Sequence, residues 1–188
     1  MSERDEVRTD RLLMRRWRRG DLPAFAAMNA DPEVMRHFPA TLDRQASDAL
    51  AERSMDRLER DGVGLWALEV IGTGEFIGFT GLNPMPEGVP GAGGTEVGWR
   101  LARRAWHRGY ATEAARAAVE VAFARERLPE LWSITAVTNT PSQAVMQRLG
   151  MTRHADFEHP ALPPGHRLRP HVAYHLDRAT WAAAGGLR

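Results

Sequence analysis

The sequence contains no cysteine and no lysine: of its 188 residues, 25 are basic residues other than histidine, and all of these are arginine. The absence of cysteine excludes disulfides, thiolate metal ligands and a thiol nucleophile. The absence of lysine excludes a P-loop lysine, a Schiff-base lysine and a lysine nucleophile. Arginine in place of lysine throughout, beside abundant alanine, is typical of a G+C-rich bacterial genome.

Long apolar runs and an excess of one charge are missing as well. No apolar stretch approaches the length that spans a membrane, and the charged residues 1–6 do not form a signal peptide, so we expect a soluble, cytoplasmic protein. The formal net charge of +1 argues against DNA or RNA as a partner. The arginines of residues 11–19 fit a solvated edge strand better than an RNA patch.

The length suits one domain, which we expect over residues 1–188 with its core at about 9–178. Residues 11–17 predict a strand, and Asp21 predicts the cap of a helix over 22–29. Residues 31–38 predict a short helical turn. Thr41 or Asp43 then begins an amphipathic helix that runs to about residue 60. The residues of that helix available to a core are Ala46, Leu50, Met55 and Leu58.

Strands dominate the signals of the middle of the chain. Residues 65–71 and 76–82 are apolar runs joined by Gly72-Thr73-Gly74-Glu75, which predicts a hairpin. The Pro- and Gly-rich residues 83–94 predict a surface loop. The elements expected after this loop are strands at 95–101, 131–137 and 171–176, and helices at 109–127 and from Thr140.

The turn that precedes the helix at Gly109 has the features of an anion site. The first amides of a helix lack partners within the helix, and the helix dipole places partial positive charge there. Gly109 and Ala111 leave these amides open, and the Thr112 hydroxyl can cap an amide or bind a phosphate oxygen. Arg103, Arg104 and Arg108 add positive charge. The turn is therefore a candidate diphosphate site, although a plain helix start with solvated arginines has the same composition.

Two ordered motifs together carry a family resemblance. The first is Trp106-His107-Arg108-Gly109-Tyr110-Ala111-Thr112-Glu113-Ala114, and the second is Asn139-Thr140-Pro141-Ser142 followed by Leu149-Gly150-Met151. With them the chain resembles the GCN5-related N-acetyltransferases, the GNAT superfamily, and within it the Rim-type branch that includes ribosomal-protein N-terminal acetyltransferases. Two departures stand in the first motif: Trp106 replaces a frequent Gln or Arg, and His107 occupies a place where a small residue is common.

The resemblance implies an α/β (α+β) fold. It would have a single domain, with a mixed central sheet of about seven strands flanked by about four helices. Its fourth and fifth strands, 95–101 and 131–137, would splay apart, so that the pantetheine arm of acetyl-CoA completes the ladder. The residues that it implies for coenzyme binding are Trp99, Leu101, Arg103, Arg104, His107, Arg108, Gly109, Tyr110, Ala111, Thr112, Asn139 and Ser142.

The implied reaction moves an acetyl group from acetyl-CoA to a primary amine. Glu96 is the carboxylate best placed to take the amine's proton, and an exposed strand glutamate paired with an arginine is the alternative reading. Ser142 is the candidate acid for the departing thiolate. It is equally compatible with a helix-start serine behind a Thr140 cap, with Gln143 closing a capping box. Tyr110 and Tyr174, the only tyrosines, rank below Ser142 as acids.

The acceptor side is predicted from the same resemblance. The segment between the first two helices would overhang the acceptor. A loop would hold residues 157–165 before the last strand and border the acceptor pocket. The candidate acceptor contacts are His37, Phe38, Glu158, His159 and Tyr174. Five histidines gather near the C-terminus, but without cysteine or a compact ligand motif we expect no metal site.

Two function classes remain open from the sequence. The first is an acetyl-CoA-dependent N-acetyltransferase acting on a protein N-terminus or a small amine. The second is a catalytically silent acyl-CoA-binding module that senses the coenzyme or regulates a partner. Glu96, Asn139 and Ser142 beside the phosphate turn favour catalysis, because binding alone needs mainly the turn. The identity of the acceptor stays open, and a homodimer is compatible with the resemblance.

Overall fold

The computed structural model describes residues 6–186. Within these residues it has eight strands and five α-helices, where the sequence predicts about seven and about four. Hydrogen bonds join the strands in the order β1-β2-β3-β4-β5-β6-β8-β7, and the sheet is mixed, as expected. The chain forms two compact units: residues up to 81 with residues 98–117, and residues 82–97 with those from 118 onward.

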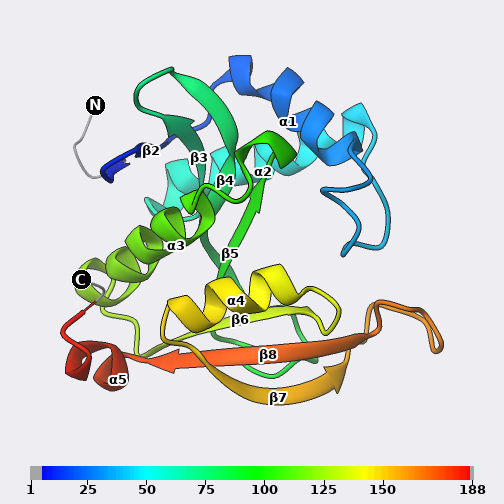
Figure 1. The fold of residues 1–188 in the computed structure, drawn as a ribbon, viewed down its shortest axis with the longest axis vertical. Helices are drawn as coiled ribbons and strands as arrows, with labels where there is room; N and C mark the ends of the chain where they lie inside the picture. The colour runs from blue at the N-terminus through cyan, green and yellow to red at the C-terminus, as the bar shows by residue number, and fades with distance from the viewer. Residues whose placement is uncertain (1–5, 187–188) are drawn as a thin grey trace. The chain divides into compact units, whose positions relative to one another are not determined.

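The first unit combines antiparallel strands with two helices that pack against each other, α1 and α2 (Figure 1). Strand β2 pairs with β1 and β3, and β3 pairs with β4 across the predicted hairpin. The bounds are β1 (Val7–Arg8), β2 (Leu12–Arg15), α1 (Leu22–Ala30), α2 (Arg44–Asp61), β3 (Leu65–Val70) and β4 (Glu75–Pro84). Strand β4 ends in the second unit.

An aromatic cluster forms the centre of the first unit. The ring of Trp17 lies 4.8 Å from that of Phe25, 5.6 Å from Phe76 and 6.2 Å from Phe79, measured between centroids. The indole Nε1 of Trp17 donates to the carbonyl of Leu65 at 2.7 Å, so its polar atom is satisfied in the core. These rings fix α1 over β3 and β4.

Helix α2 begins where the sequence predicts but buries a different face. Asp43 caps it by accepting a hydrogen bond from the amide of Ala46 at 2.8 Å, and Gly62 ends it at φ +72°. The buried residues are Ser47, Ala51, Ser54 and Leu58, so of the predicted set only Leu58 is buried. The two serines are buried because they find partners: Ser47 accepts from Asn29, and Ser54 donates to the carbonyl of Leu50.

The N-terminal arginines are not all solvated charges. Arg15 is 2 % exposed. Its guanidinium donates to both carboxylate oxygens of Asp21, at 2.8 and 2.9 Å, and to Glu69 at 2.6 Å. Asp21 therefore does not cap α1 with its side chain, because its carboxylate is held by Arg15 and by the amide of Arg18. The predicted helical turn at 31–38 is a series of turns with no helix.

The second unit is built on three strands and a helix. Strand β8 pairs antiparallel with β6 on one side and β7 on the other, and α4 packs along β6 (Figure 1). Strand β5 begins in this unit, where Glu96 pairs with Trp132 of β6 in parallel, and continues into the first unit. The bounds are β5 (Thr95–Leu101), β6 (Glu130–Ala136), α4 (Thr140–Arg148), β7 (Thr152–Glu158), β8 (Pro170–Asp177) and α5 (Arg178–Ala183).

Two predicted boundaries in this region are wrong. Phe157 and Glu158 end strand β7 instead of belonging to a loop, because they pair with His171 and Pro170 of β8. The helix predicted over 109–127 is α3 (Tyr110–Glu120) followed by a π-helical turn, Val121–Arg125. Strands β1 and β7 and helix α5 correspond to none of the individually predicted elements, and they raise the element counts above those expected.

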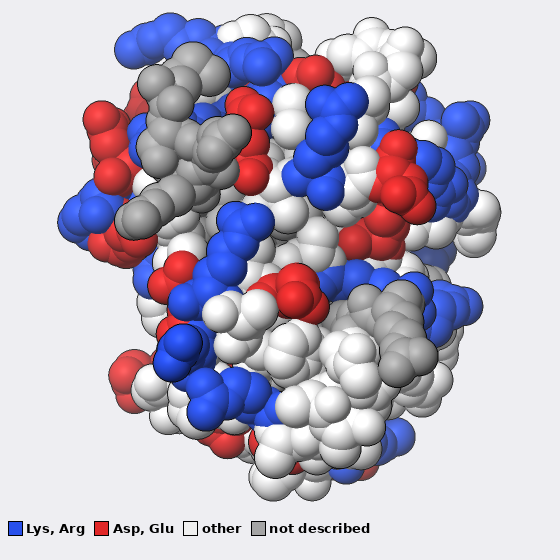
Figure 2. Space-filling view, turned by 90° about the vertical axis from the view of Figure 1, so that its left-hand side faces the viewer, with Lys and Arg blue, Asp and Glu red and all other residues white. Residues whose placement is uncertain are grey.

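The described surface and helices bear on possible partners. On the face shown in Figure 2, basic and acidic side chains are interspersed and form no patch of a single sign. None of the helices in residues 6–186 is long and apolar enough to cross a membrane.

Candidate functional site

The turn between β5 and α3 departs from the usual backbone conformations at two residues. After the short 3₁₀ helix Arg103–Ala105, His107 and Gly109 both adopt positive φ, +59° and +80°, on either side of Arg108. Successive amides in such alternating conformations form a concave anion-binding nest. The amides lead directly into the N-terminus of α3 at Tyr110, which adds the helix dipole.

The positive φ of His107 explains why a small residue suits this position. A non-glycine residue in the left-handed region costs about 1–3 kcal/mol and persists only where its surroundings hold it. One contact that holds the turn comes from the neighbouring Trp106. Its Nε1 donates to the carbonyl of Leu101 at 2.8 Å and so connects the turn to the end of β5.

Arg11 clamps the outside of this turn, a role that the sequence did not reveal. Its Nη1 donates to the carbonyl of Arg108 at 2.9 Å, and its Nε donates to the Glu113 carboxylate at 2.7 Å. Its guanidinium lies 4.7 Å from the ring centroid of Tyr110. One side chain thus holds the turn, the first residue of α3 and the first-turn acid together.

Glu113 completes the clamp. Its carboxylate accepts from the Thr9 hydroxyl at 2.6 Å and from the backbone amide of Arg11 at 2.9 Å. Burial alone would raise the pKa of Glu113, but the hydrogen bonds from Thr9 and Arg11 outweigh it and hold the pKa below its ordinary value. Because a lowered folded-state pKa stabilises the folded protein above the unfolded pKa, this contribution is lost as the pH falls into the acid range.

We predict that Arg11→Ala weakens acetyl-CoA binding about tenfold, because the turn loses the contacts that position its amides. Arg11→Lys keeps the charge but not the two-pronged geometry, so it should restore only part of the affinity. The control is Arg8→Ala, at the exposed residue of β1. Isothermal titration with acetyl-CoA measures the effect. An unchanged dissociation constant for Arg11→Ala would show that the contacts of Arg11 do not prepare the turn for the coenzyme.

The arginines predicted to add charge to the turn differ in their contacts. Arg104 pairs with Glu75, and its Nη2 donates to the carbonyl of Phe76 at 2.8 Å, so part of its charge is compensated within the first unit. Arg103 and Arg108 are exposed. Of the remaining turn residues, Ala111 and Thr112 are half-buried in the first turn of α3.

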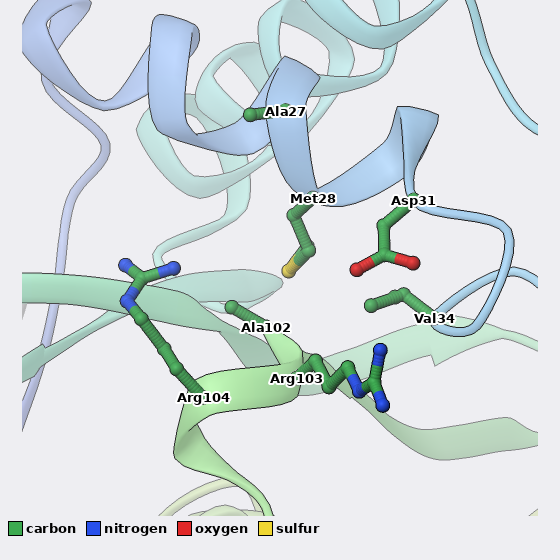
Figure 3. Close-up of a pocket in the computed structure, with 7 residues that line it drawn as sticks. All are labelled: Ala27, Met28, Asp31, Val34, Ala102, Arg103 and Arg104. Carbon is green, nitrogen blue, oxygen red and sulfur yellow. The ribbon is translucent and has the colours of Figure 1, made fainter.

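A pocket of about 540 Å³ lies beside the start of this turn (Figure 3). The Met28 thioether and the Asp31 carboxylate point into it from the α1 side, and Arg103 lies opposite. Its volume falls in the range of small-molecule sites. The lining residues are Ala27, Met28, Asp31, Val34, Ala102, Arg103 and Arg104.

Glu96 has the electrostatics of a general base. Burial raises its pKa to about 7, and a hydrogen bond from the backbone of Ile134 lowers it only in part. A carboxylate with this pKa is near half-ionised at neutral pH, where it can both accept and release a proton. Glu96 is half-buried, and among the described residues no arginine lowers its pKa, so the sequence's alternative of an exposed glutamate paired with an arginine is the less favoured one.

The start of α4 is capped by Asn139, not by Thr140. The Oδ1 of Asn139 accepts from the amide of Ser142 at 3.3 Å, and its Nδ2 donates to the Thr135 hydroxyl at 2.9 Å. Gln143 does not close a capping box, since its Nε2 donates to the carbonyl of Val137. Ser142 is bound through its backbone in this cap and lies half-buried in the first turn of the helix.

Tyr174 is buried beneath α4 at 2 % exposure. Its hydroxyl donates to Gln143 and accepts from Gln147, both at 3.4 Å. These contacts commit the Tyr174 hydroxyl to α4, which is consistent with ranking it below Ser142 as an acid.

The other acceptor candidates have defined neighbours. His37 accepts from the Nε of Arg36, and Phe38 lies under the guanidinium of Arg100. In the second unit Glu158 pairs with Arg169 at 2.8 Å.

His159 lies 4.7 Å from His171 between ring centroids. Burial lowers the pKa of both imidazoles. Among the described residues, no group of three or more histidines and acidic residues is arranged to hold a metal ion.

Residues 11–152 match the family model described as "Acetyltransferase (GNAT) domain". The match covers most of the chain, so the chain belongs to the GNAT family of acetyl-CoA-dependent acetyltransferases. The mixed eight-stranded sheet and the five α-helices of the described residues are consistent with the GNAT fold.

The chain is also similar in sequence to a curated protein and in fold to solved structures. An uncharacterized protein of Bacillus subtilis, YkkB, is 29 % identical over 80 % of this chain and 87 % of its own length. A GNAT-family acetyltransferase from Bacillus anthracis shares the fold with a TM-score of 0.78 at 22 % identity, over 93 % of this chain and 99 % of that one. Spermidine N-acetyltransferase from Vibrio cholerae, solved with CoA and spermine, has a TM-score of 0.73 at 16 % identity over 93 % and 99 %.

Proposed function

We propose that this protein transfers the acetyl group of acetyl-CoA directly to a primary amine. The observation that carries the proposal is the turn before α3, where positive φ at His107 and Gly109 and the Arg11 clamp prepare a backbone anion site. The coenzyme diphosphate binds there, with Tyr110, Ala111 and Thr112 at the helix start. The family membership supports acetyl-CoA as the ligand.

The uncharged arm of the coenzyme needs a different surface from the diphosphate. The pocket beside the turn offers apolar walls from Met28, Val34 and Ala102, which suit the dimethyl and alkyl parts of the pantetheine. We assign Trp99, Leu101 and Arg103 to this arm. The carbonyl of Leu101 is already bound by Trp106, so Leu101 contributes through its remaining backbone and side-chain atoms.

The chemistry begins with deprotonation of the acceptor ammonium by Glu96, directly or through one water. The free amine attacks the thioester carbonyl and forms a tetrahedral intermediate. Its collapse breaks the carbon–sulfur bond and releases the coenzyme as a thiolate, and the nitrogen passes its remaining excess proton to water, which leaves the neutral amide. Ser142 donates a proton to this thiolate and is reprotonated from solvent. Because the sequence has no cysteine or lysine, no acetyl-enzyme on such a group intervenes.

We predict that Ser142→Ala lowers turnover about tenfold or more while leaving the affinity for acetyl-CoA nearly unchanged. The cap of α4 survives this change, because Asn139 binds the backbone amide of residue 142. Thr140→Ala, at an exposed position of the same turn, is the control. Steady-state kinetics separate the two parameters, and equal turnover in Ser142→Ala would leave Ser142 as a helix-start residue only.

The acceptor is an amine on a protein N-terminus or on a small molecule. The Rim-type resemblance of the motif from Trp106 to Ala114 supports an N-terminal α-amine. We assign its recognition to His37 and Phe38 of the first unit and to His159 and Tyr174 of the second unit. Glu158 is tied to Arg169, so its charge is partly compensated.

The test is release of free CoA from acetyl-CoA by the purified protein, against a panel of N-terminal peptides and small amines. The protein has no thiol of its own, so a thiol-detecting reagent reports only the coenzyme. Acceptor-dependent release supports the proposal and identifies the acceptor class. Tight binding of acetyl-CoA without release for any acceptor would instead indicate a sensor of the coenzyme.

A further inference from the structure

The guanidinium of Arg100 on β5 is buried without an acidic partner among the described residues. Its Nη1 donates to Oδ1 of Asn29 at 2.7 Å, and its Cζ lies 4.0 Å from the ring centroid of Phe38 and 5.5 Å from that of Phe79. Its Nε is sealed from solvent and, within residues 6–186, makes no hydrogen bond. Burial lowers the pKa of Arg100 to about 10, so the group stays charged at neutral pH.

The same unit shows how this chain neutralises a buried arginine when the role is structural. Arg15 is held by two carboxylates, Asp21 and Glu69, which raise its pKa despite burial. Arg100 has only a neutral amide and two aromatic faces. Because an uncompensated buried charge is costly, its retention points to a partner that arrives from outside the chain.

The surroundings of Arg100 are also pre-organised. Asn29 is fully buried, and its Nδ2 donates to the Ser47 hydroxyl at 2.9 Å, which fixes the amide oxygen that binds Nη1. The Phe38 ring holds the plane of the guanidinium. Arg100 nonetheless keeps some solvent exposure as a residue, so a ligand can reach the side chain. Because Nε is sealed, a carboxylate meets the guanidinium through Nη2, the terminal nitrogen that no described residue binds.

We infer that Arg100 binds a carboxylate of the acceptor, which makes the acceptor an amine that carries a carboxylate, such as an amino acid or a short peptide. The inference rests on the proposed acetyl transfer. Side chains along a strand alternate between faces, and Glu96, Gly98 and Arg100 follow at two-residue steps along β5. The thioester and pantetheine are uncharged, so an anion at Arg100 belongs to the acceptor. A polyamine, with several positive charges, is disfavoured.

The test compares acceptors that differ only at the carboxylate. Dipeptides and tripeptides with a free N-terminus are supplied either as the acid or as the C-terminal amide, so that the basicity of the reacting amine barely changes. The kcat/KM of acetyl transfer is measured for the wild type, Arg100→Gln, Arg100→Lys and the control Arg44→Gln. Arg44 is exposed on α2 and paired with Asp48 at 2.7 Å.

The wild type is expected to prefer the best acid over its amide by about ten- to a hundredfold, as for a charge-assisted hydrogen bond. Arg100→Gln should bring this ratio to about one, mainly through KM. It should slow transfer to the amide far less than transfer to the acid, and it should leave the affinity for acetyl-CoA unchanged. Arg100→Lys should keep part of the preference, and Arg44→Gln all of it.

Three results would overturn the inference. The first is a wild type that prefers no acid over its amide. The second is an Arg100→Gln variant that slows acetyl transfer to acid and amide equally, and the third is weaker acetyl-CoA binding by that variant. If no acceptor releases CoA, the proposed transfer fails, and thermal shift of the acetyl-CoA complex decides the carboxylate site separately. Stabilisation by acids but not amides, lost in Arg100→Gln, supports the site, and equal shifts reject it.

Discussion

Gly109→Glu is expected to abolish acetyl-CoA binding, with at least a hundredfold loss of affinity. Gly109 adopts φ +80°, a backbone conformation that is strained for any residue with a side chain. A Cβ at this position would lie 3.3 Å from Nη2 of Arg11. The new carboxylate would lie against Arg11 and compete with Glu113 and the carbonyl of Arg108 for its guanidinium, and its charge would repel the phosphates at the neighbouring amides. Titration calorimetry with acetyl-CoA measures the loss.

The control separates strain from blockage of the site. Gly62→Glu introduces the same residue at φ +72° with open space around it, at the end of α2, so it should leave the affinity unchanged. Gly109→Ala carries the strain without the charge and should fall between the wild type and Gly109→Glu. Undiminished acetyl-CoA affinity in folded Gly109→Glu would refute the phosphate assignment of this turn.

Glu96→Gln is expected to lower kcat about a hundredfold, within the range for loss of a general base. Gln has nearly the same shape and keeps an oxygen that can accept from the backbone of Ile134, so binding of acetyl-CoA should be unaffected. Stopped assays of acetylated product at saturating substrates measure the change. A turnover within threefold of wild type would mean that water alone removes the amine's proton.

The pH dependence gives a second readout of Glu96. With a pKa of about 7, the base changes from mostly protonated to mostly ionised across neutrality, so kcat should rise as the pH passes through 7, and Glu96→Gln should lack that rise. A raised folded-state pKa stabilises the folded protein fully below the unfolded pKa and loses that contribution as the pH rises through 7. Glu96→Gln should therefore melt above the wild type at pH 8 and with it at pH 4.

Local signals were enough for much of the fold. Asp43, one of the two starts that the sequence offers, caps α2, and the helix ends within a residue of the predicted end, because a cap and a left-handed stop at Gly62 act within one turn of chain. The buried face of α2 was misjudged because hydropathy ranks serine as exposed, whereas Ser47 is buried by its partner Asn29, 18 residues away. Asp21 likewise has a tertiary partner, Arg15, that overrides its local role as a cap.

In the candidate site, too, the features set by neighbouring residues were predictable, and those set by distant residues were not. The turn before α3 was predictable, since glycine and the helix start are local features. The positive φ at His107 was not, because it is imposed by the surrounding contacts. Arg11 and Arg100 were missed as site residues. Arg11 binds Glu113, which lies 102 residues away, and Arg100 contacts Phe38 and binds Asn29, which lies 71 residues away. These partners meet only in the folded chain, so the sequence alone does not show the role of either arginine.

The most direct test of direct acetyl transfer is the stoichiometry of products, measured by mass spectrometry after a limited number of turnovers with the best acceptor. The account predicts one acetylated amine for each free CoA released, with no acetyl group on the protein at any time. Free acetate in place of acetylated acceptor, or an acetylated protein that forms and decays at the rate of turnover, would contradict it.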